Sequence, residues 1–594
     1  MNHFFNKIVW QCDNWRSSSR ANRRRKGLLR YPFRDHILIL GGGGMVEELL
    51  EAIATRQEWA EKSVVVLSSL DAEQVRGRLA LKLSLEAKGL AVNVYHGERT
   101  MAEELRMCHV DQASLIFIVG EDGENGHDAL NVECWKKVRA LRLHAPQVAQ
   151  CYLSLDSSST ISLLHMLPQE AHTSVETTII NRSELMVQQL LMGDSPQAVP
   201  QTLDRGLITV NADRYVHLVV VGMNAMGYAF ATTAAQMCHF PNFDESSPKP
   251  LRTRITFVDP AADVKMNHFK SSHASLFDLS HSRYMTDPSS WLQGRPESRY
   301  GDFLDVEWEF VKAAIDAEWV RGMLVLCATD AQQVLSVAFC SDSADENFQQ
   351  SIHLPQQLYA DYSDIGEARN DEPNIYVYQP QSNALVRAAQ AEVARLRNLI
   401  PFGAAREGYD PLLTRQTSVA KRVNYLYQKE TSGKQFVAMP TDTASLDGIW
   451  QQLSLAEKLS SIRSASAVYA QLRGLGLDAA QSVQPLDDGA RVDSLSRTEQ
   501  ARRNMEKLLV GYAAMPAAER HRLNAALAND DPEVRQEART YANRNANQLF
   551  VLKDIAPYSG LPEAAKADIR TIVSNLPLAA LPHISSVEEQ PSRS

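Results

Sequence analysis

The chain has 594 residues, which exceeds what one hydrophobic core normally supports, so three or four domains are predicted. Hydrophobic residues make up 44% of the chain and charged residues 22%, an ordinary globular composition. The formal net charge of −10 argues against a nucleic-acid-binding protein. The seven cysteines are scattered without a CxxC pair, which predicts a reducing compartment and neither a zinc knuckle nor a redox motif.

Two features of the sequence bear on location. No window of about 18 or more uninterrupted apolar residues occurs, and the beginning of the chain lacks the apolar core of a signal peptide. We therefore expect a cytoplasmic protein without membrane-spanning helices. Residues 1–35 are predicted to form a basic arm that also carries Trp10 and Trp15. A solvated arm is the simpler interpretation, and attraction to anionic lipid, which would place the protein at the membrane periphery, is the alternative.

A first α/β domain is predicted over residues 36–205. Residues 36–40 have the pattern of an apolar strand, residues 41–44 are a run of glycine, and residues 45–53 have helical spacing. Further apolar runs lie at 64–67, 91–95 and 115–120. Continuous apolar strands that alternate with amphipathic helices indicate a parallel sheet covered on both faces.

The same unit recurs over residues 213–400. An apolar strand at 215–221 leads into Gly222 and, five residues later, Gly227, which begins an apolar helix. Other strands of this domain are predicted at 254–259, 323–328 and 375–378. The predicted fold class is therefore α/β, with two tandem Rossmann-like doubly wound parallel-sheet domains followed by an α-helical C-terminal region.

The glycine turns are the candidate binding sites of the sequence. A glycine-rich turn between a strand and a helix points backbone N–H groups at an anion, and the helix dipole adds to the attraction. The candidate cofactor-binding residues are Gly41, Gly43 and Gly44 in the first turn, Gly222, Asn224 and Gly227 in the second, and Asp259 beyond it. Neither dinucleotide fingerprint is intact, because Val46 takes the third position of the first and Asn224 the middle position of the second.

An acidic residue at the end of the second strand would bind the ribose hydroxyls of a dinucleotide. Asp259 stands at this place in the second domain. The corresponding strand of the first domain ends in Ser68 and Ser69, with only Asp71 beyond it, so it lacks an acidic contact for a ribose. The second turn is thus the better nucleotide candidate, and an empty or altered pocket is the alternative at either turn.

No group of residues in the sequence indicates catalysis or metal binding. The histidines are dispersed, and neither HExxH nor GxSxG occurs. Asp305, Glu307 and Glu309 would share one side of a strand, but a solvated face or the first turn of a helix is the simpler interpretation. We predict no catalytic residues and no metal site.

Several segments of the first domain together resemble the regulator-of-potassium-conductance (RCK), or TrkA-N, domain. They are the Gly41 turn, the strand at 64–69, the turn at 95–98, the stretch at 110–113 and the closing helix at 183–187. The tandem pair with its basic lead-in most resembles the cytosolic part of Castor/Pollux-type ion channels. The family often has Gly-Asp where this chain has Gly97 and Glu98.

The resemblance implies a function in sensing rather than catalysis. Such domains bind NAD(H), another adenine nucleotide or an ion and move the gate of a channel or transporter. The pore helices of the family are missing here, so a separate membrane channel or transporter would be the partner, and a homodimer is compatible with this arrangement. The alternatives are a non-catalytic interaction scaffold with degenerate nucleotide sites and, third, an NAD(P)-dependent oxidoreductase.

The C-terminal third is predicted to be helical, with a helical linker region at 401–490 and a flexible tail at 581–594. Residues 495–512 resemble the first helix of a ryanodine-receptor-type (RyR) domain, and residues 553–563 resemble its characteristic ending, which places an RyR-like domain at 494–580. Gln500 and Arg503 replace the usual histidine and tryptophan of that helix, and an alanine-rich insertion follows Tyr512. No ligand is assigned to this domain, and helix packing is the simpler role for Glu499, Arg502 and Tyr512.

Overall fold

The computed structural model of the chain forms two compact units, Met1–Arg182 and Ser183–Ser594. The described residues are 26, 28, 31–54, 59, 61–83, 91–121, 126–166, 174–292, 303–359, 372–403, 415–431, 438–440, 443–477 and 484–580. Most of the predicted basic arm and all of the predicted tail at 581–594 lie outside the described residues.

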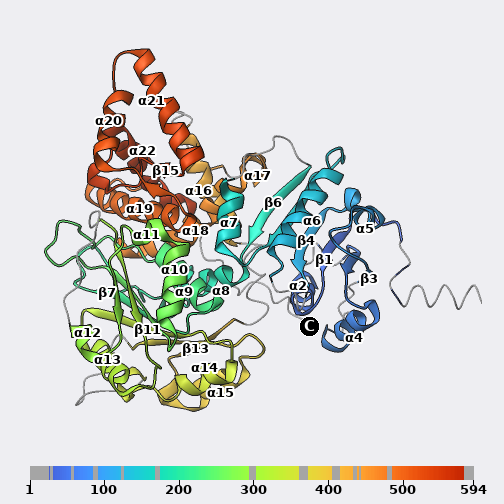
Figure 1. The fold of residues 1–594 in the computed structure, drawn as a ribbon, viewed down its shortest axis with the longest axis horizontal. Coiled ribbons are helices and arrows are strands. Elements are labelled where there is room, and N and C mark those ends of the chain that lie inside the picture. The colour runs from blue at the N-terminus through green and yellow to red at the C-terminus, as the bar shows by residue number, and fades with distance from the viewer. Residues whose placement is uncertain are drawn as a thin grey trace, which may run out of the picture. The chain divides into compact units, whose positions relative to one another are not determined.

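The first unit contains a parallel sheet of six strands in the order β3-β2-β1-β4-β5-β6 (Figure 1). The strands are β1 (Ile37–Gly41), β2 (Val64–Ser68), β3 (Val92–His96), β4 (Leu115–Gly120), β5 (Ala149–Ser154) and β6 (Val175–Ile180). The helices are α2 (Gly44–Ala54), α4 (Ala72–Leu83), α5 (Ala102–Met107), α6 (Asp128–Leu141) and α7 (Ser158–Met166). All residues of β1, β2 and β4 are buried, as expected for strands covered on both faces.

The second unit contains a parallel sheet of seven strands in the order β13-β12-β11-β7-β8-β10-β9 (Figure 1). The strands are β7 (Tyr215–Val221), β8 (Thr253–Val258), β9 (Ser282–Met285), β10 (Val306–Val311), β11 (Gln333–Phe339), β12 (Asn374–Tyr378) and β13 (Leu399–Phe402). Its helices up to this point are α8 (Arg182–Met192), α9 (Ala225–Met237), α10 (Ala262–Ser272), α11 (Ala274–Phe277), α12 (Pro288–Leu292), α13 (Glu318–Thr329), α14 (Ala344–Ser351) and α15 (Ala384–Glu392). The predicted class of two Rossmann-like parallel sheets is confirmed.

The predicted strand at 323–328 is wrong, because these residues lie in helix α13. Met323, Leu324 and Cys327 of this segment are buried, whereas Leu326 is 55% exposed. A helix turns such a run of apolar residues to different sides, and only part of it reaches the core. The strand of this region is instead β11, which pairs with β7 along its whole length.

The solvated-face interpretation of the acidic stretch at 305–309 is also wrong. Glu307 and Glu309 lie in strand β10, Asp305 directly precedes it, and all three are at most 3% exposed. His239 contacts Asp305 at 2.8 Å, and Arg254 contacts Glu307 at 2.7 Å. Buried carboxylates require such partners, which come from distant parts of the chain and which the local pattern does not reveal.

Apart from the helices at 517–544, which pack in a smaller cluster of their own, the C-terminal helices share one hydrophobic core with the second sheet. The elements are α16 (Arg415–Thr431), α17 (Thr443–Gln451), α18 (Leu455–Gly474), α19 (Gly489–Val510), β14 (Ala513–Ala514), α20 (Ala517–Leu527), α21 (Pro532–Arg544), β15 (Val551–Leu552) and α22 (Glu563–Ser574). Helix α9 packs against both α18 and α19. Helices α20 and α21 form a hairpin that extends away from the other helices of this unit (Figure 1).

No helix among the described residues is long and apolar enough to cross a membrane.

The six cysteines that the structure describes are buried and form no disulfide, and burial raises the pKa of the Cys134 thiol to about 12. These thiols act as small core side chains and are poor nucleophiles at neutral pH.

Candidate functional site

Both glycine turns lie where a parallel sheet of this kind binds ligands. In the first sheet β1 lies between β2 and β4, and in the second sheet β7 lies between β8 and β11. The connections change direction at these strands, and in sheets of this kind ligands bind at the carboxyl ends of such strands. The turns that follow β1 and β7 therefore stand at the topological switch point of each unit.

The second turn is built by two glycines. Gly222 has a φ of 98°, a left-handed conformation that strains other residues, and its amide donates to the carbonyl oxygen of Val258 at 3.0 Å. A β-carbon built on Gly227 would lie only 2.0 Å from the carbonyl oxygen of Gly222. Both predicted glycines are thus required by the backbone, and Gly227 lets α9 start directly against the turn.

Asn224, which replaces the middle glycine, caps helix α9. Its Oδ1 accepts a hydrogen bond from the Gly227 amide at 2.9 Å. Its Nδ2 donates to the carbonyl oxygen of Cys340 at 2.6 Å and to Asp342 at 2.7 Å. The side chain therefore links the turn after β7 to the segment after β11 and satisfies one of the first amides of α9.

Asp259 lies at the end of β8 and contacts the second turn. Its Oδ2 accepts from the Met223 amide at 2.8 Å and from Lys265 Nζ at 2.7 Å, and its Oδ1 accepts from the Ala261 amide at 2.8 Å. Burial would raise the pKa of Asp259, but the hydrogen bonds from Lys265 and the two amides hold it below its ordinary value. The ionised carboxylate stands beside the turn, as required for binding ribose hydroxyls.

The first turn has a similar backbone. Gly41 has a φ of 138° and Gly43 a φ of 97°, whereas Gly44 is the first residue of α2 and has open space around its α-carbon. A β-carbon on Gly41 would lie 2.0 Å from the carbonyl oxygen of Gly120, and the Gly42 amide donates to this same oxygen at 2.8 Å. Gly41 and Gly43 are thus needed for the turn itself, and Gly44 is not.

Glu121 is a residue of the first turn that the sequence analysis missed. It follows β4, is 5% exposed, and accepts hydrogen bonds from the Ser68 hydroxyl and the Ser69 amide, both at 2.8 Å. A β-carbon on Gly42 would lie 2.5 Å from Glu121 Oε2. The first turn therefore has a carboxylate beside it, although β2 ends without an acidic residue.

A buried ionic network crosses the second sheet below the turn. Glu309 accepts hydrogen bonds from Thr256 at 2.8 Å and from Arg283 Nε at 3.0 Å, while Arg254 donates to Glu307. Burial would raise the pKa of Glu309, but Arg254 and Arg283 hold it below its ordinary value. All these side chains come from neighbouring strands and pair with one another, so removal of one partner would leave a buried charge unpaired.

A second ionic group lies inside the C-terminal helices. Arg502 donates to Glu499 at 2.9 Å and to Glu506 at 2.8 Å, with all three side chains at most 3% exposed. Burial would raise the pKa of Glu499, but the charge of Arg502 lowers it to about 2. Gln500 donates from Nε2 to the carbonyl oxygens of Asp554 and Ala556, which joins α19 to the segment before α22.

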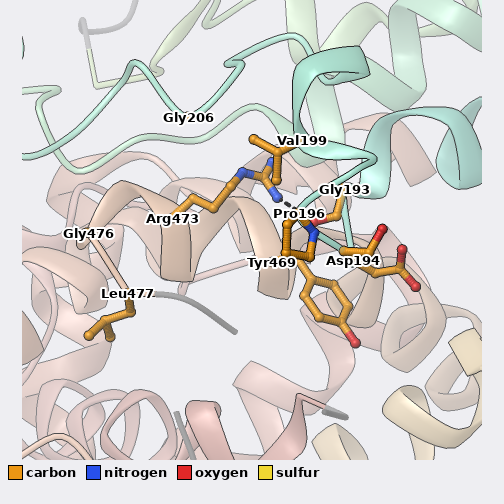
Figure 2. A pocket seen from close by; sticks show the side chains of 10 residues that line it. Gly193, Asp194, Pro196, Val199, Gly206, Tyr469, Arg473, Gly476 and Leu477 are labelled. Atoms are coloured by element: carbon orange, nitrogen blue, oxygen red, sulfur yellow. Dashed lines mark hydrogen bonds between the residues drawn. The ribbon is translucent and has the colours of Figure 1, made fainter. Parts of the chain in front are cut away.

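The second unit also contains a cavity of about 370 Å³ that no predicted residue lines (Figure 2). Its wall comes from the loop after α8 and from the end of α18, and includes Asp194, Pro196, Tyr469, Arg473 and Leu477. Figure 2 shows Arg473 reaching from α18 toward Gly193, whose carbonyl oxygen it contacts at 2.9 Å. The volume suits a small metabolite, but the lining residues lie about 270 positions apart in the sequence, so no local pattern predicts the cavity.

No protein-family description matches the sequence. No curated protein matches it either.

Several solved structures overlap with the chain at low identity. The crystal structure of GsuK bound to ADP is 14% identical, with a TM-score of 0.33 over 64% of this chain and 70% of that chain. The GsuK channel bound to NAD is 13% identical, with a TM-score of 0.32 over 64% of this chain and 63% of that chain. The human SLO3 gating ring is 9% identical, with a TM-score of 0.35 over 63% of this chain and 81% of that chain.

Proposed function

We propose that this chain is a cytoplasmic, non-catalytic regulatory protein that senses NAD(H) or another adenine nucleotide. The second glycine turn, with Gly222, Gly227 and Asp259, is the main binding site, and the first turn, with Gly41, Gly43 and Gly44, is a second one. The sequence resemblance to RCK domains supports a separate membrane channel or transporter as the partner that the sensor controls.

The position of helix α9 carries this proposal. The helix begins at the second turn and is packed between the sheet and helices α18 and α19. A ligand that binds one position of α9 better than another shifts the population between them. Since α9 shares its core with the C-terminal helices, a movement of α9 would also move these helices through direct packing.

Thermal unfolding of the full chain with NAD⁺, NADH, ADP or ATP tests the proposal. A ligand at 100 times its Kd stabilises the native state by about 2.7 kcal/mol, so an increase of several degrees in Tm is expected. Asp259→Asn should reduce the increase because it removes the charge that accepts the ribose hydroxyls. Asp263→Asn is the matched control, since this carboxylate is 41% exposed and pairs with Lys312. No Tm change with any of the four nucleotides would contradict the proposal.

A non-catalytic interaction scaffold is the second candidate, and the bridge made by Asn224 favours it. This side chain already occupies the crevice at which a pyrophosphate would approach the turn. The scaffold predicts that the purified protein carries no nucleotide in a mass spectrum and still binds a protein partner. Co-purification of a stoichiometric nucleotide would exclude it.

A further inference from the structure

The first turn has a carboxylate that comes from an unexpected strand. Glu121 reaches from the end of β4 across the turn to the end of β2, where it accepts hydrogen bonds from Ser68 and Ser69 at 2.8 Å each. A β-carbon at residue 42 would lie 2.3 Å from the Ser68 hydroxyl oxygen and 2.5 Å from Glu121 Oε2, so a larger residue there would displace these side chains. The carboxylate, the glycine and the two serines therefore form one packed group.

Strand register shows which position of the second sheet this group corresponds to. In the first sheet the last pair of β1 and β2 is Leu40 with Leu67, and Ser68 follows. In the second sheet the last pair of β7 and β8 ends at Val258, and Asp259 follows. Ser68 thus occupies the place of Asp259. Its hydroxyl donates to the carboxylate of Glu121, which comes from β4 and not from β2.

The two carboxylates also lie beside the same position of their turns. Asp259 accepts a hydrogen bond from the amide of Met223, the second residue of its turn, and Glu121 lies against Gly42, the second residue of the first turn. Asp259 is 4% exposed and Glu121 is 5% exposed. Equivalent placement and equal burial indicate that the first unit supplies the same chemical group from another strand.

We propose that Glu121 determines the ligand specificity of the first turn by accepting hydrogen bonds from the ribose hydroxyls of an adenine nucleotide. The inference depends on the proposed function, because it assumes that the turn binds a nucleotide. A carboxylate attracts a free ribose diol and repels a phosphate attached to it. The first turn therefore takes nucleotides with free 2′ and 3′ hydroxyls, such as NAD⁺, and excludes 2′-phosphorylated ones such as NADP⁺.

Titration calorimetry of the full chain with NAD⁺ and NADP⁺ tests this assignment. The Asp259→Asn variant disables the second turn, so the NAD⁺ binding that remains reports the first. Adding Glu121→Gln, which keeps the shape of the side chain, should weaken this binding at least tenfold and reduce the preference for NAD⁺ over NADP⁺. Adding Ser68→Asp as well returns an acid to β2 and should restore both. Glu103→Gln is the control, because this side chain is 80% exposed on α5.

The outcomes separate this inference from the proposed function. If the unmodified chain binds no nucleotide, both are wrong. If it binds NAD⁺ but Asp259→Asn abolishes all binding, the assignment of Glu121 is overturned, and nucleotide sensing at the second turn alone stands. If Glu121→Gln leaves the remaining binding and its NAD⁺ preference unchanged, the assignment is overturned and the whole proposed function stands. Circular dichroism of each variant confirms folding, and recovery by Ser68→Asp cannot result from a misfolded chain.

Discussion

Arg473 of α18 ties the segment after α8 to the C-terminal helices, and its removal should destabilise the second unit strongly. Nε and Nη2 donate to the two oxygens of Asp204 at 3.0 and 2.7 Å, and Nη1 donates to the carbonyl oxygen of Gly193 at 2.9 Å. The side chains of Arg473 and Asp204 are 10% and 4% exposed. Arg473→Met leaves the charge of Asp204 buried and unpaired, which costs about 3–5 kcal/mol.

Urea unfolding at pH 7 measures this effect through the fluorescence of Trp308 and Trp450, which are buried in the core that Arg473 helps to hold. Adding Asp204→Asn to Arg473→Met removes the unpaired charge, so the double variant should be more stable than Arg473→Met alone. A loss below about 1 kcal/mol in the single variant, or strictly additive losses in the pair, would refute the reasoning about burial.

The same ion pair predicts a dependence on pH. Burial would raise the pKa of Asp204, but Arg473, Thr202 and Gly206 hold it below its ordinary value of 3.8. A carboxylate with a lowered pKa contributes its full stability above pH 3.8 and loses it as the pH falls through the lower value of the folded state. In Arg473→Met, burial without the arginine raises the pKa of Asp204 above 3.8. The stability difference between the unmodified chain and Arg473→Met should therefore begin to shrink above pH 3.8 and continue to shrink until the pH passes the lowered pKa of the unmodified chain, and a constant difference would contradict the assignment.

Three further predictions concern other parts of the molecule. Gly227→Ala places a methyl group 2.0 Å from the Gly222 carbonyl oxygen, so the free energy of unfolding should fall by about 1–3 kcal/mol and Tm should fall with it. Gly322→Ala is the control and should not lower Tm, because its β-carbon meets nothing within 4 Å. Burial lowers the pKa of His36 to about 4, so the free energy of unfolding of the first unit should decrease by up to about 3 kcal/mol as the pH falls from 6.5 to 4. His36→Gln should remove this dependence on pH. Glu309→Gln should lower the denaturation midpoint by breaking the buried network of the second sheet but leave the Kd for NAD⁺ unchanged; a changed Kd would assign the network to binding.

The sheets could be predicted from sequence because their central strands have a simple local signature. Every residue of β1 and β4 is buried, so each strand is a continuous apolar run, and the glycine turn after β1 marks its end. The same rule misled at 323–328, where a helix with apolar residues on most sides imitates a strand. Strand β10 was not recognised for the opposite reason, since the buried charges of Glu307 and Glu309 give it a polar pattern.

The candidate site could be predicted only where its residues are close in sequence. Gly222, Gly227 and Asp259 follow a spacing that a known motif defines, and the structure brings them together. Glu121 could not be found in this way, because it reaches the end of β2 from β4, more than fifty positions later in the chain. The only signal in the sequence is that the acidic residue directly follows a buried strand that ends in glycine.

The helices that follow the two turns differ in a way that their sequences already express. Helix α9 has no charged residue and buries ten of its 13 residues, whereas α2 contains three glutamates and buries six of 11. A helix that is apolar all round must be covered on all sides, and α18 and α19 provide this cover. Movement at the second turn must therefore displace the C-terminal helices or be blocked by them. A ligand at that turn would thus be coupled to the helical region by packing, and it would act as a signal only if it bound the displaced arrangement more tightly than the other one.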